Sequence, residues 1–487
     1  MARSVISHPL LPVCCGALLL CATALEAQPP GDDTYAWPKD AGVLENLKRW
    51  QGFKFGILVH QGLYSQLGIV ESWELCPEPW VERKGYDDYW TFAQNYRNTK
   101  SVFNPVNFDP GKWAEAFKAA GAKYVIYTTK HHDGFCLFDT AFTDFKVTQK
   151  GCPFSTNARS NIAKEVFAAC RNEGLAVGAY FSKPDWTSTN FWWPKYPPFD
   201  RNPNYDVTQY KDRWQNFVTY THNQINELVS DYGPLDILWL DGCWVRPFST
   251  INASVAEFCK YPHDLDIDMK SIAANARAKQ PGILIVDRWV QGPYENYLTP
   301  EQKVPDKPLS APWESCISMG GAWGWVPHDH YKSSRELIQL LVKIVAKGGN
   351  LLLGIGPDGK GEFDPQVYAR LRDVGHWLDA NGGAIYGTSP IEPYSAGNIA
   401  YTAGSDRVTY AIYLTGANEE ELPANLDFQT KLNGSIRVSL PASNTILDFA
   451  PLSNGVRVSI SESLRKRLAA QPAVVFRIES SQPDRIR

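Results

Sequence analysis

The chain has 487 residues, a formal net charge of -4 at pH 7 and an apolar fraction of 44%. This length exceeds one ordinary domain, so we expect one large unit and one smaller companion. The balanced charge excludes nucleic acid and anionic membrane surfaces as main partners, because both require a strongly basic face. The 17 Trp and 23 Tyr residues are a heavy aromatic load, and flat rings with a polar edge suit the faces of sugars.

Residues 1 to 27 have the pattern of a cleavable secretory signal. Arg3 precedes an apolar run from Pro9 to Leu25, and small alanines end the segment. No later segment reaches the roughly 18 uncharged apolar residues that a membrane-spanning helix needs. We therefore expect an exported protein without a membrane span, secreted or periplasmic, or lysosomal if the host is an animal.

Strand-like and helix-like segments alternate from the first strand candidate to about residue 390. The strand candidates are residues 53 to 60, 123 to 132, 176 to 182, 236 to 241, 283 to 289 and 350 to 357. Segments of helical spacing precede the second, third and fourth candidates, at 108 to 122, 160 to 175 and 208 to 232. This alternation predicts a parallel sheet covered by helices, a (β/α)8-like TIM barrel that occupies residues 28 to 390.

The character of the sequence changes after about residue 390. Helical spacing disappears, and short alternating runs such as VTYAIYL and SIRVSL follow. Residues 391 to 487 are therefore expected to form a small antiparallel β-sandwich domain.

Ionisable residues end several of the predicted strands. Asp241, His60, His131, His132 and Arg288 all stand at such ends. In a β/α barrel the carboxyl ends of the strands converge on one face, where enzymes of this fold place their chemistry. A lone aspartate after a strand more often caps a turn, but a carboxylate among these neighbours is suited to act as a nucleophile or base.

The three histidines allow two interpretations. They could bind a metal ion, or they could exchange hydrogen bonds with sugar hydroxyls. Adjacent side chains on an extended strand point to opposite faces, so chelation by His131 and His132 together would need a bend. We favour hydroxyl binding and expect no metal and no cofactor; a metal-dependent hydrolase that uses His60, His131 and His132 is the weaker alternative.

Seven segments resemble the α-L-fucosidases of glycoside hydrolase family 29, and they follow that family's order over roughly residues 45 to 390. They are KFGILVHQGLYS, FDPGKWAEAFKAAGAKYVIYTTKHHDGFCLFDT, GLAVGAYFSKPDW, LDILWLDG, VDRW, WESCISMGGAWGW and GNLLLGIGPDGKG. The resemblance implies a retaining, exo-acting α-L-fucosidase that acts on a fucosylated glycan or glycoconjugate through a covalent glycosyl-enzyme.

The resemblance also implies which carboxylates react. Asp241 matches the position of the nucleophile. The general acid/base lies in a more variable segment, where Glu301 is our choice and Glu314 the rival. Retaining chemistry requires the two carboxyl groups to be roughly 5 to 5.5 Å apart.

A set of substrate-binding residues is implied in the same way. It consists of His60, Glu71, Trp73, His131, His132, Tyr180, Trp239, Arg288 and Trp323. Compared with the family pattern, two features differ near the expected sugar pocket: Gln61 replaces a Trp, and the ESWEL segment carries an insertion. The stretch from Cys243 to Lys279 is expected to shape sites for the leaving group. Two further alternatives remain, a carbohydrate-binding protein that has lost catalysis and a hydrolase of a related sugar.

Overall fold

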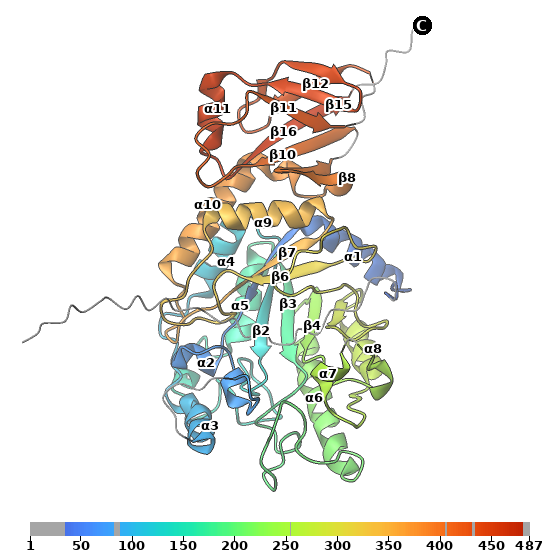
Figure 1. Cartoon of the computed structure of the whole chain (residues 1–487). Coiled ribbons are helices and arrows are strands. Elements are labelled where there is room, and N and C mark those ends of the chain that lie inside the picture. The colour runs from blue at the N-terminus through green and yellow to red at the C-terminus, as the bar shows by residue number, and fades with distance from the viewer. Residues whose placement is uncertain (1–34, 82–87, 254, 405–406, 431–433, 481–487) are drawn as a thin grey trace, which may run out of the picture.

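The computed structural model describes residues 35–81, 88–253, 255–404, 407–430 and 434–480 (Figure 1). The expected secretory signal, residues 1 to 27, lies outside these residues. Within the described part of the chain, no helix is both long enough and apolar enough to cross a membrane.

A seven-stranded parallel sheet forms the centre of the larger part of the molecule. Its order is β5-β4-β3-β2-β1-β7-β6. The strands are β1 (Phe55–Val59), β2 (Tyr124–Lys130), β3 (Ala176–Ser182), β4 (Ile237–Asp241), β5 (Leu284–Asp287), β6 (Glu314–Ser318) and β7 (Asn350–Ile355). All six predicted strands are present, and each begins and ends within two residues of its predicted bounds.

Helices cover the outer face of the curled sheet (Figure 1). They are α4 (Pro110–Ala119), α5 (Ile162–Asn172), α6 (Lys211–Asp231), α8 (Met269–Lys279), α9 (Ser334–Ala346) and α10 (Pro365–Asn381). Helix α1 (Ala41–Phe53) instead packs Val43, Leu47 and Trp50 against the side chains of the barrel interior. Each strand is buried on both sides, because alternate residues face the helices or the barrel interior. In β1, Ile57 and Val59 join the core under the helices, whereas Leu58 joins the interior cluster with Tyr124, Tyr180 and Trp239.

The curled sheet closes through an irregular segment, residues 294 to 302, which stands where an eighth strand would lie. This segment makes backbone hydrogen bonds to β5, such as Asn296 N to Ile285 O at 2.9 Å, and to β6, such as Gln302 N to Cys316 O at 2.9 Å. The sequence did not reveal β6, because ESCIS is short and half polar, and a run of that composition has no strand signature. The predicted barrel thus has seven strands and one irregular closing segment among the described residues.

Shorter helices belong to the loops at the carboxyl ends of the strands. They are α2 (Leu63–Leu67) and α3 (Tyr89–Asn98) after β1, and α7 (Ala256–Cys259) after β4. Short 3-10 turns complete these loops at Trp73–Leu75, Thr99–Ser101, Pro153–Thr156 and Phe248–Thr250, and a further turn, Gly382–Ala384, follows α10.

Two antiparallel sheets follow the barrel. The larger has the order β13-β12-β16-β10-β9-β8 and the smaller the order β11-β15-β14. The strands are β8 (Ser389–Ala396), β9 (Ile399–Ala403), β10 (Val408–Leu414), β11 (Asn425–Gln429), β12 (Ile436–Leu440), β13 (Thr445–Ile446), β14 (Phe449–Leu452), β15 (Gly455–Ser459) and β16 (Ala473–Ser480), with α11 (Glu462–Ala469) beside them. Phe428 of the smaller sheet packs against Phe476 of the larger, with ring centroids 4.7 Å apart. The predicted sandwich is therefore present.

Helix α9 lies between the barrel and the sandwich (Figure 1). Its Gln339 Nε2 donates to Pro472 O at 2.8 Å, and Trp377 Nε1 of α10 donates to Ala473 O at 2.9 Å. These bonds satisfy backbone groups at the start of β16, so the sandwich braces the end of the barrel that is remote from the carboxyl ends of the strands.

The close approach of α10 to α4 gives a stability prediction. A Cβ at Gly375 would lie 2.0 Å from Ala119 O, a backbone atom that cannot move away alone. We expect Gly375→Ala to lower the free energy of unfolding by about 1–3 kcal/mol, measured by urea or thermal unfolding. The control is Gly52→Ala in α1, where no heavy atom lies within 4 Å and alanine favours the helix. Equal stability of the two variants would contradict the prediction.

Candidate functional site

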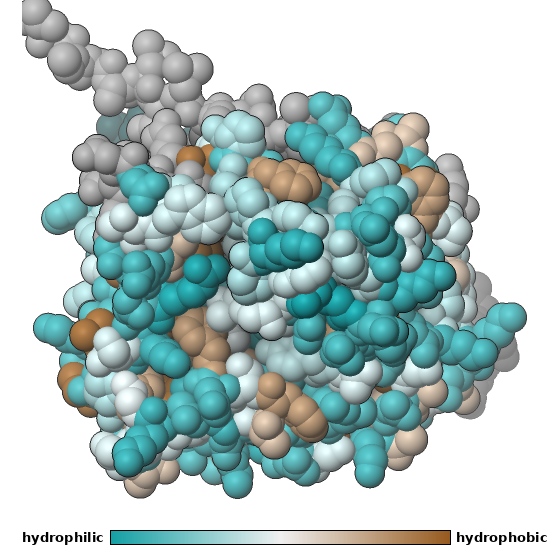
Figure 2. Space-filling model, turned by 90° about the horizontal axis from the view of Figure 1, so that it is seen from below, coloured by the Kyte–Doolittle hydropathy of each residue, from teal (hydrophilic) through white to brown (hydrophobic). Residues whose placement is uncertain are grey.

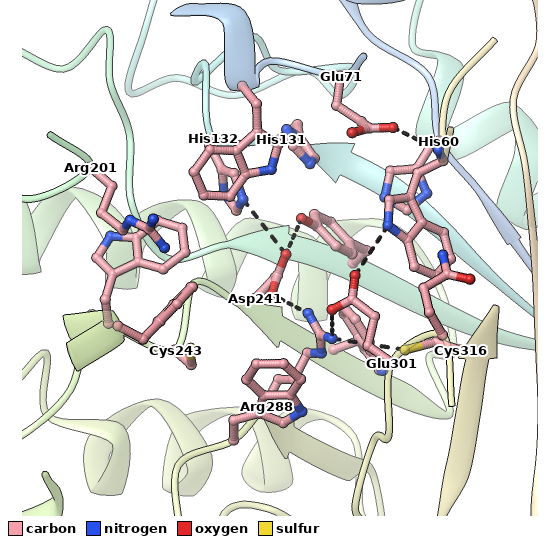
Figure 3. A pocket seen from close by; sticks show the side chains of 18 of the residues that line it. His60, Glu71, His131, His132, Arg201, Asp241, Cys243, Arg288, Glu301 and Cys316 are labelled. Atoms are coloured by element: carbon pink, nitrogen blue, oxygen red, sulfur yellow. Dashed lines mark hydrogen bonds and ion pairs between the residues drawn. The ribbon is translucent and has the colours of Figure 1, made fainter. Parts of the chain in front are cut away.

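A cavity of about 390 Å³ opens at the carboxyl ends of the strands. The eleven residues that the sequence singled out for catalysis and binding all line it: His60, Glu71, Trp73, His131, His132, Tyr180, Trp239, Asp241, Arg288, Glu301 and Trp323. Figure 3 shows many of these side chains pointing toward one another from different strands. Figure 2 shows the molecule from this end, where the surface is mostly hydrophilic and apolar side chains form small separate groups.

Asp241 is the last residue of β4 and faces this cavity. The next residue, Gly242, has a φ of 89°, in the left-handed region that favours glycine, and this lets the chain turn sharply after the strand. The Tyr180 hydroxyl donates to Asp241 Oδ2 at 2.7 Å, and Arg288 Nη1 donates to Asp241 Oδ1 at 3.0 Å. Both carboxylate oxygens are thus held by directed donors.

The surroundings of Asp241 keep it ionised. Burial alone would raise the pKa of this carboxyl, but the charge of Arg288, the nearby His132 and the Tyr180 hydrogen bond together hold the pKa well below its usual range. His132 Nε2 lies 3.7 Å from Asp241 Oδ2. A buried carboxylate that stays charged in this way is available as a nucleophile.

Glu301 contacts the same arginine from the closing segment of the barrel. Arg288 Nη2 donates to Glu301 Oε2, and Trp323 Nε1 donates to Glu301 Oε1 at 3.2 Å. The backbone of Glu301 pairs with Cys316 in β6. One guanidinium therefore bridges Asp241 and Glu301 across the cavity (Figure 3).

Glu314, the rival carboxylate, lies elsewhere. It begins β6, at the amino end of the strand, and it does not line the cavity. The Tyr124 hydroxyl donates to Glu314 Oε2 at 2.5 Å. Burial raises the pKa of Glu314 to about 8, although hydrogen bonds from Tyr124, Trp239 and Tyr297 act in the other direction. Glu314 is therefore a buried acid at the opposite end of the barrel interior.

The histidines line one wall of the cavity. Strand β2 ends at Lys130, and the chain turns directly afterwards, so His131 and His132 both face the cavity with ring centroids 4.2 Å apart. The alternation expected of an extended strand does not apply to them for this reason. Ser72 Oγ lies 2.5 Å from His131 Nδ1, whereas His60 Nδ1 and His132 Nδ1 have no hydrogen-bond partner among the described residues.

These imidazoles are neutral near pH 7. Burial lowers the pKa of His132 to about 4 and places the pKa values of His60 and His131 well below the ordinary value. A neutral imidazole has one donor and one acceptor, which matches a sugar hydroxyl. The described residues contain no group of three or more His, Cys, Asp or Glu side chains arranged to hold a metal ion.

The ESWEL segment brings two of its residues to the cavity, Glu71 and Trp73, but not Glu74. Glu71 Oε1 accepts hydrogen bonds from Trp323 N at 2.7 Å and Gly324 N at 2.9 Å, which fixes the loop that carries the Trp323 indole. Burial raises the pKa of Glu71 to about 7, with a further contribution from Glu301.

Gln61 does not lie where we expected it. It is buried but does not line the cavity, and its Oε1 accepts from the Tyr127 hydroxyl at 2.7 Å. Tyr127 belongs to the core between the sheet and the helices, so Gln61 points behind β1 rather than into the sugar pocket. Gln61, which we expected near the sugar pocket, is therefore not a lining residue of the cavity.

The cavity also contains residues that sequence reasoning missed. They are Leu58, Trp80, Arg201, Cys243, Trp244, Glu257, Phe258, Lys260, Trp289, Gln302, Lys303 and Cys316. Five of them, Cys243, Trp244, Glu257, Phe258 and Lys260, belong to the stretch after Asp241 that we expected to shape specificity. Arg201 had no local signal, since it stands in an irregular loop after β3 with no motif around it.

Comparison with known sequences identifies relatives of the whole catalytic part. The profile of a family described as Alpha-L-fucosidase matches residues 22–383. The tissue alpha-L-fucosidase of Rattus norvegicus is 30% identical over 421 residues, which cover 82% of this chain and 83% of that protein. The tissue alpha-L-fucosidase of Homo sapiens is 30% identical over 417 residues, 80% of this chain and 79% of that protein.

Solved structures agree with this result. The α-L-fucosidase isoenzyme 1 of Paenibacillus thiaminolyticus superposes with a TM-score of 0.71 at 29% identity, and covers 91% of this chain and 100% of its own. The Thermotoga maritima α-fucosidase in complex with a mechanism-based inhibitor superposes with a TM-score of 0.69 at 26% identity and the same coverage. The family profile, the sequence relatives and the shared barrel together show that this chain belongs to the α-L-fucosidases of glycoside hydrolase family 29.

Proposed function

We propose that this protein is a retaining, exo-acting enzyme that hydrolyses terminal α-L-fucosyl residues from glycans or glycoconjugates, with Asp241 as nucleophile and Glu301 as general acid/base. The observation that carries the proposal is the bridge made by Arg288, which contacts both carboxylates in one cavity. A carbohydrate-binding protein without catalysis would need hydroxyl contacts but no such carboxylate pair.

The first half of the reaction replaces the glycosidic bond by an ester. Asp241 Oδ attacks the anomeric carbon, and the bond from that carbon to the leaving oxygen breaks as Glu301 gives its proton to that oxygen. Arg288 restrains both carboxylates through separate nitrogens, which supports the short separation that a retaining enzyme requires.

The second half releases the sugar. Glu301, now ionised, takes a proton from a water molecule, and the resulting hydroxide oxygen bonds to the anomeric carbon while the ester bond to Asp241 breaks. Attack from opposite faces in the two halves returns the original configuration. The Tyr180 hydroxyl and Arg288 stabilise the Asp241 carboxylate as it leaves.

The rest of the cavity is suited to a small neutral sugar. Unpartnered nitrogens of His60 and His132 are ready for hydroxyl groups, and burial keeps both rings uncharged. Tyr180 and Trp239 stack with centroids 5.2 Å apart and offer an apolar surface to a methyl group. We also propose, from the apolar run near the start of the chain, that the protein acts after export from the cytoplasm.

Removal of the nucleophile should abolish turnover. We expect Asp241→Gly to reduce kcat for an aryl α-L-fucoside by at least about 10⁴-fold, measured by nitrophenol release, with a thermal unfolding midpoint close to that of the parent protein. Turnover by the parent should persist in the presence of a chelator. Near-normal activity of the folded variant would remove Asp241 from the role.

Removal of the acid/base should depend on the leaving group. We expect Glu301→Ala to lower kcat/KM by about 10²–10⁴-fold for a sugar leaving group and much less for nitrophenol, since nitrophenolate leaves without protonation. Azide should restore turnover of the aryl substrate by replacing the activated water. Rescue by azide of Glu314→Ala, but not of Glu301→Ala, would transfer the role to Glu314.

Glu314 gives a prediction for stability against pH. Its pKa of about 8 exceeds the ordinary 4.5, so its contribution to stability is fully present below pH 4.5 and is lost as the pH rises toward 8. We expect Glu314→Gln to make the fall of unfolding free energy between pH 5 and 8 shallower, by up to about 1.4 kcal/mol per pH unit, while turnover continues. Unfolding by denaturant at several pH values measures the slope; identical slopes in both proteins would refute the prediction.

A further inference from the structure

One buried arginine in the cavity has no part in the reaction described above. Arg201 lies in the loop between β3 and α6, is only 5% exposed and lines the cavity. Figure 3 shows it across Asp241 from Glu301, with His132 near the space between. The cavity therefore extends to a second wall, away from the proposed acid/base.

Arg201 is held in a fixed orientation. Its Nε donates to Glu78 Oε1 at 2.6 Å, and its guanidinium carbon lies 4.1 Å from the ring centroid of Phe258 and 5.5 Å from that of Trp244. Asn202 Nδ2 donates to Cys259 O at 3.0 Å and ties the Arg201 loop to α7. Glu78 occupies Nε, whereas Nη1 has no hydrogen-bond partner among the described residues and remains available for one.

This wall contains buried donors without acceptors. Arg201 Nη1 and Trp244 Nε1 are both buried and have no hydrogen-bond partner within the described residues. Buried polar groups of folded proteins are ordinarily paired. Guanidinium and indole N–H groups can only donate, and the Arg201 guanidinium carbon lies 5.5 Å from the Trp244 ring centroid. A partner with acceptor oxygens therefore suits both groups.

An oxyanion fits these donors better than a hydroxyl group. A hydroxyl group carries a proton that itself needs an acceptor, whereas a sulfate ester has three acceptor oxygens and no proton to donate. A guanidinium can bind such an oxyanion through two parallel N–H bonds. Lys260 and Glu257, close in sequence at α7, also line the cavity and have opposite charges. Recognition of an anion at this wall would therefore depend on the hydrogen-bond donors of Arg201 and Trp244 more than on a net positive charge.

The position of the wall indicates which sugar carries the anion. Glu301 must contact the leaving oxygen in order to protonate it, so the leaving group extends on the Glu301 side. Arg201 lies on the other side of Asp241 (Figure 3), next to the sugar that Asp241 attacks. We propose that Arg201 and Trp244 bind a sulfate ester on the fucose ring itself, so that the enzyme accepts a monosulfated terminal α-L-fucoside; this inference rests on the proposed function.

The wild-type protein provides the first test. Nitrophenyl α-L-fucoside and its 2-, 3- and 4-monosulfated forms are compared by nitrophenol release. We expect one sulfated isomer to have a lower KM than the unsulfated compound, and a lower KM than the same isomer with a neutral O-acetyl group in place of sulfate. The inference is overturned if no sulfated isomer meets both conditions. Absence of turnover of all of these fucosides would instead contradict the proposed function, and calorimetric binding of sulfated and unsulfated fucose would then test the Arg201 wall separately from catalysis.

A variant pair assigns the effect to Arg201. The double substitution Arg201→Met with Glu78→Gln removes the cation without leaving Glu78 as an unpaired buried charge. We expect the KM ratio of sulfated to unsulfated substrate to rise roughly tenfold or more. The matched control is Arg213→Met, since Arg213 also stacks on an indole, 4.1 Å from the Trp193 centroid, but does not line the cavity. An unchanged ratio in the folded double variant would overturn the assignment; if that variant does not fold, the comparison of sulfate with O-acetyl in the wild-type protein decides.

Discussion

The bridge from Arg288 to two carboxylates is the interaction on which the site depends. Asp241 reaches it from a regular strand, and Glu301 reaches it from the irregular segment that closes the barrel. The guanidinium offsets the repulsion between the two carboxylates, since like charges repel strongly where water is scarce. The closing segment replaces a regular strand, and this lets one side chain turn into the cavity at the level of the strand ends.

Burial has opposite effects on the ionisable groups around this bridge. It makes Glu71 a weaker acid, with a pKa of about 7, and it keeps His132 neutral, with a pKa of about 4. Asp241 and Arg288 resist the trend. Arg288, His132 and Tyr180 favour the charged form of Asp241, and Glu301 and Asp241 favour the charged form of Arg288. The cavity therefore holds the Asp241 anion beside the Arg288 cation and neutral imidazoles, which keeps this carboxylate available for nucleophilic attack on a sugar.

The cavity has two walls of different origin. Strand ends and the turns directly after them supply the wall around Asp241, so its geometry follows from the sheet. Longer loops supply the wall around Arg201, where the segment after β3 and the short helix α7 contact each other through Asn202 and Cys259. Loops tolerate change more readily than strands, which is consistent with a reaction that the barrel determines and a substrate preference that the loops determine.

The sequence by itself determined the barrel, the sandwich and most of the reactive wall. Buried parallel strands have continuous apolar runs, and residues at their ends, such as Asp241 and Arg288, are placed by the strand that precedes them. Only the tertiary structure decided between Glu301 and Glu314 as cavity residues, because both follow irregular or short segments whose direction depends on distant backbone partners. The same holds for Gln61, which turns toward Tyr127, and for Arg201, whose orientation is set by Glu78 more than 100 residues away. The local sequence pattern determines which side chains stand at the end of a strand, because the strand itself places them. Contacts between loops far apart in sequence determine which other side chains reach the cavity.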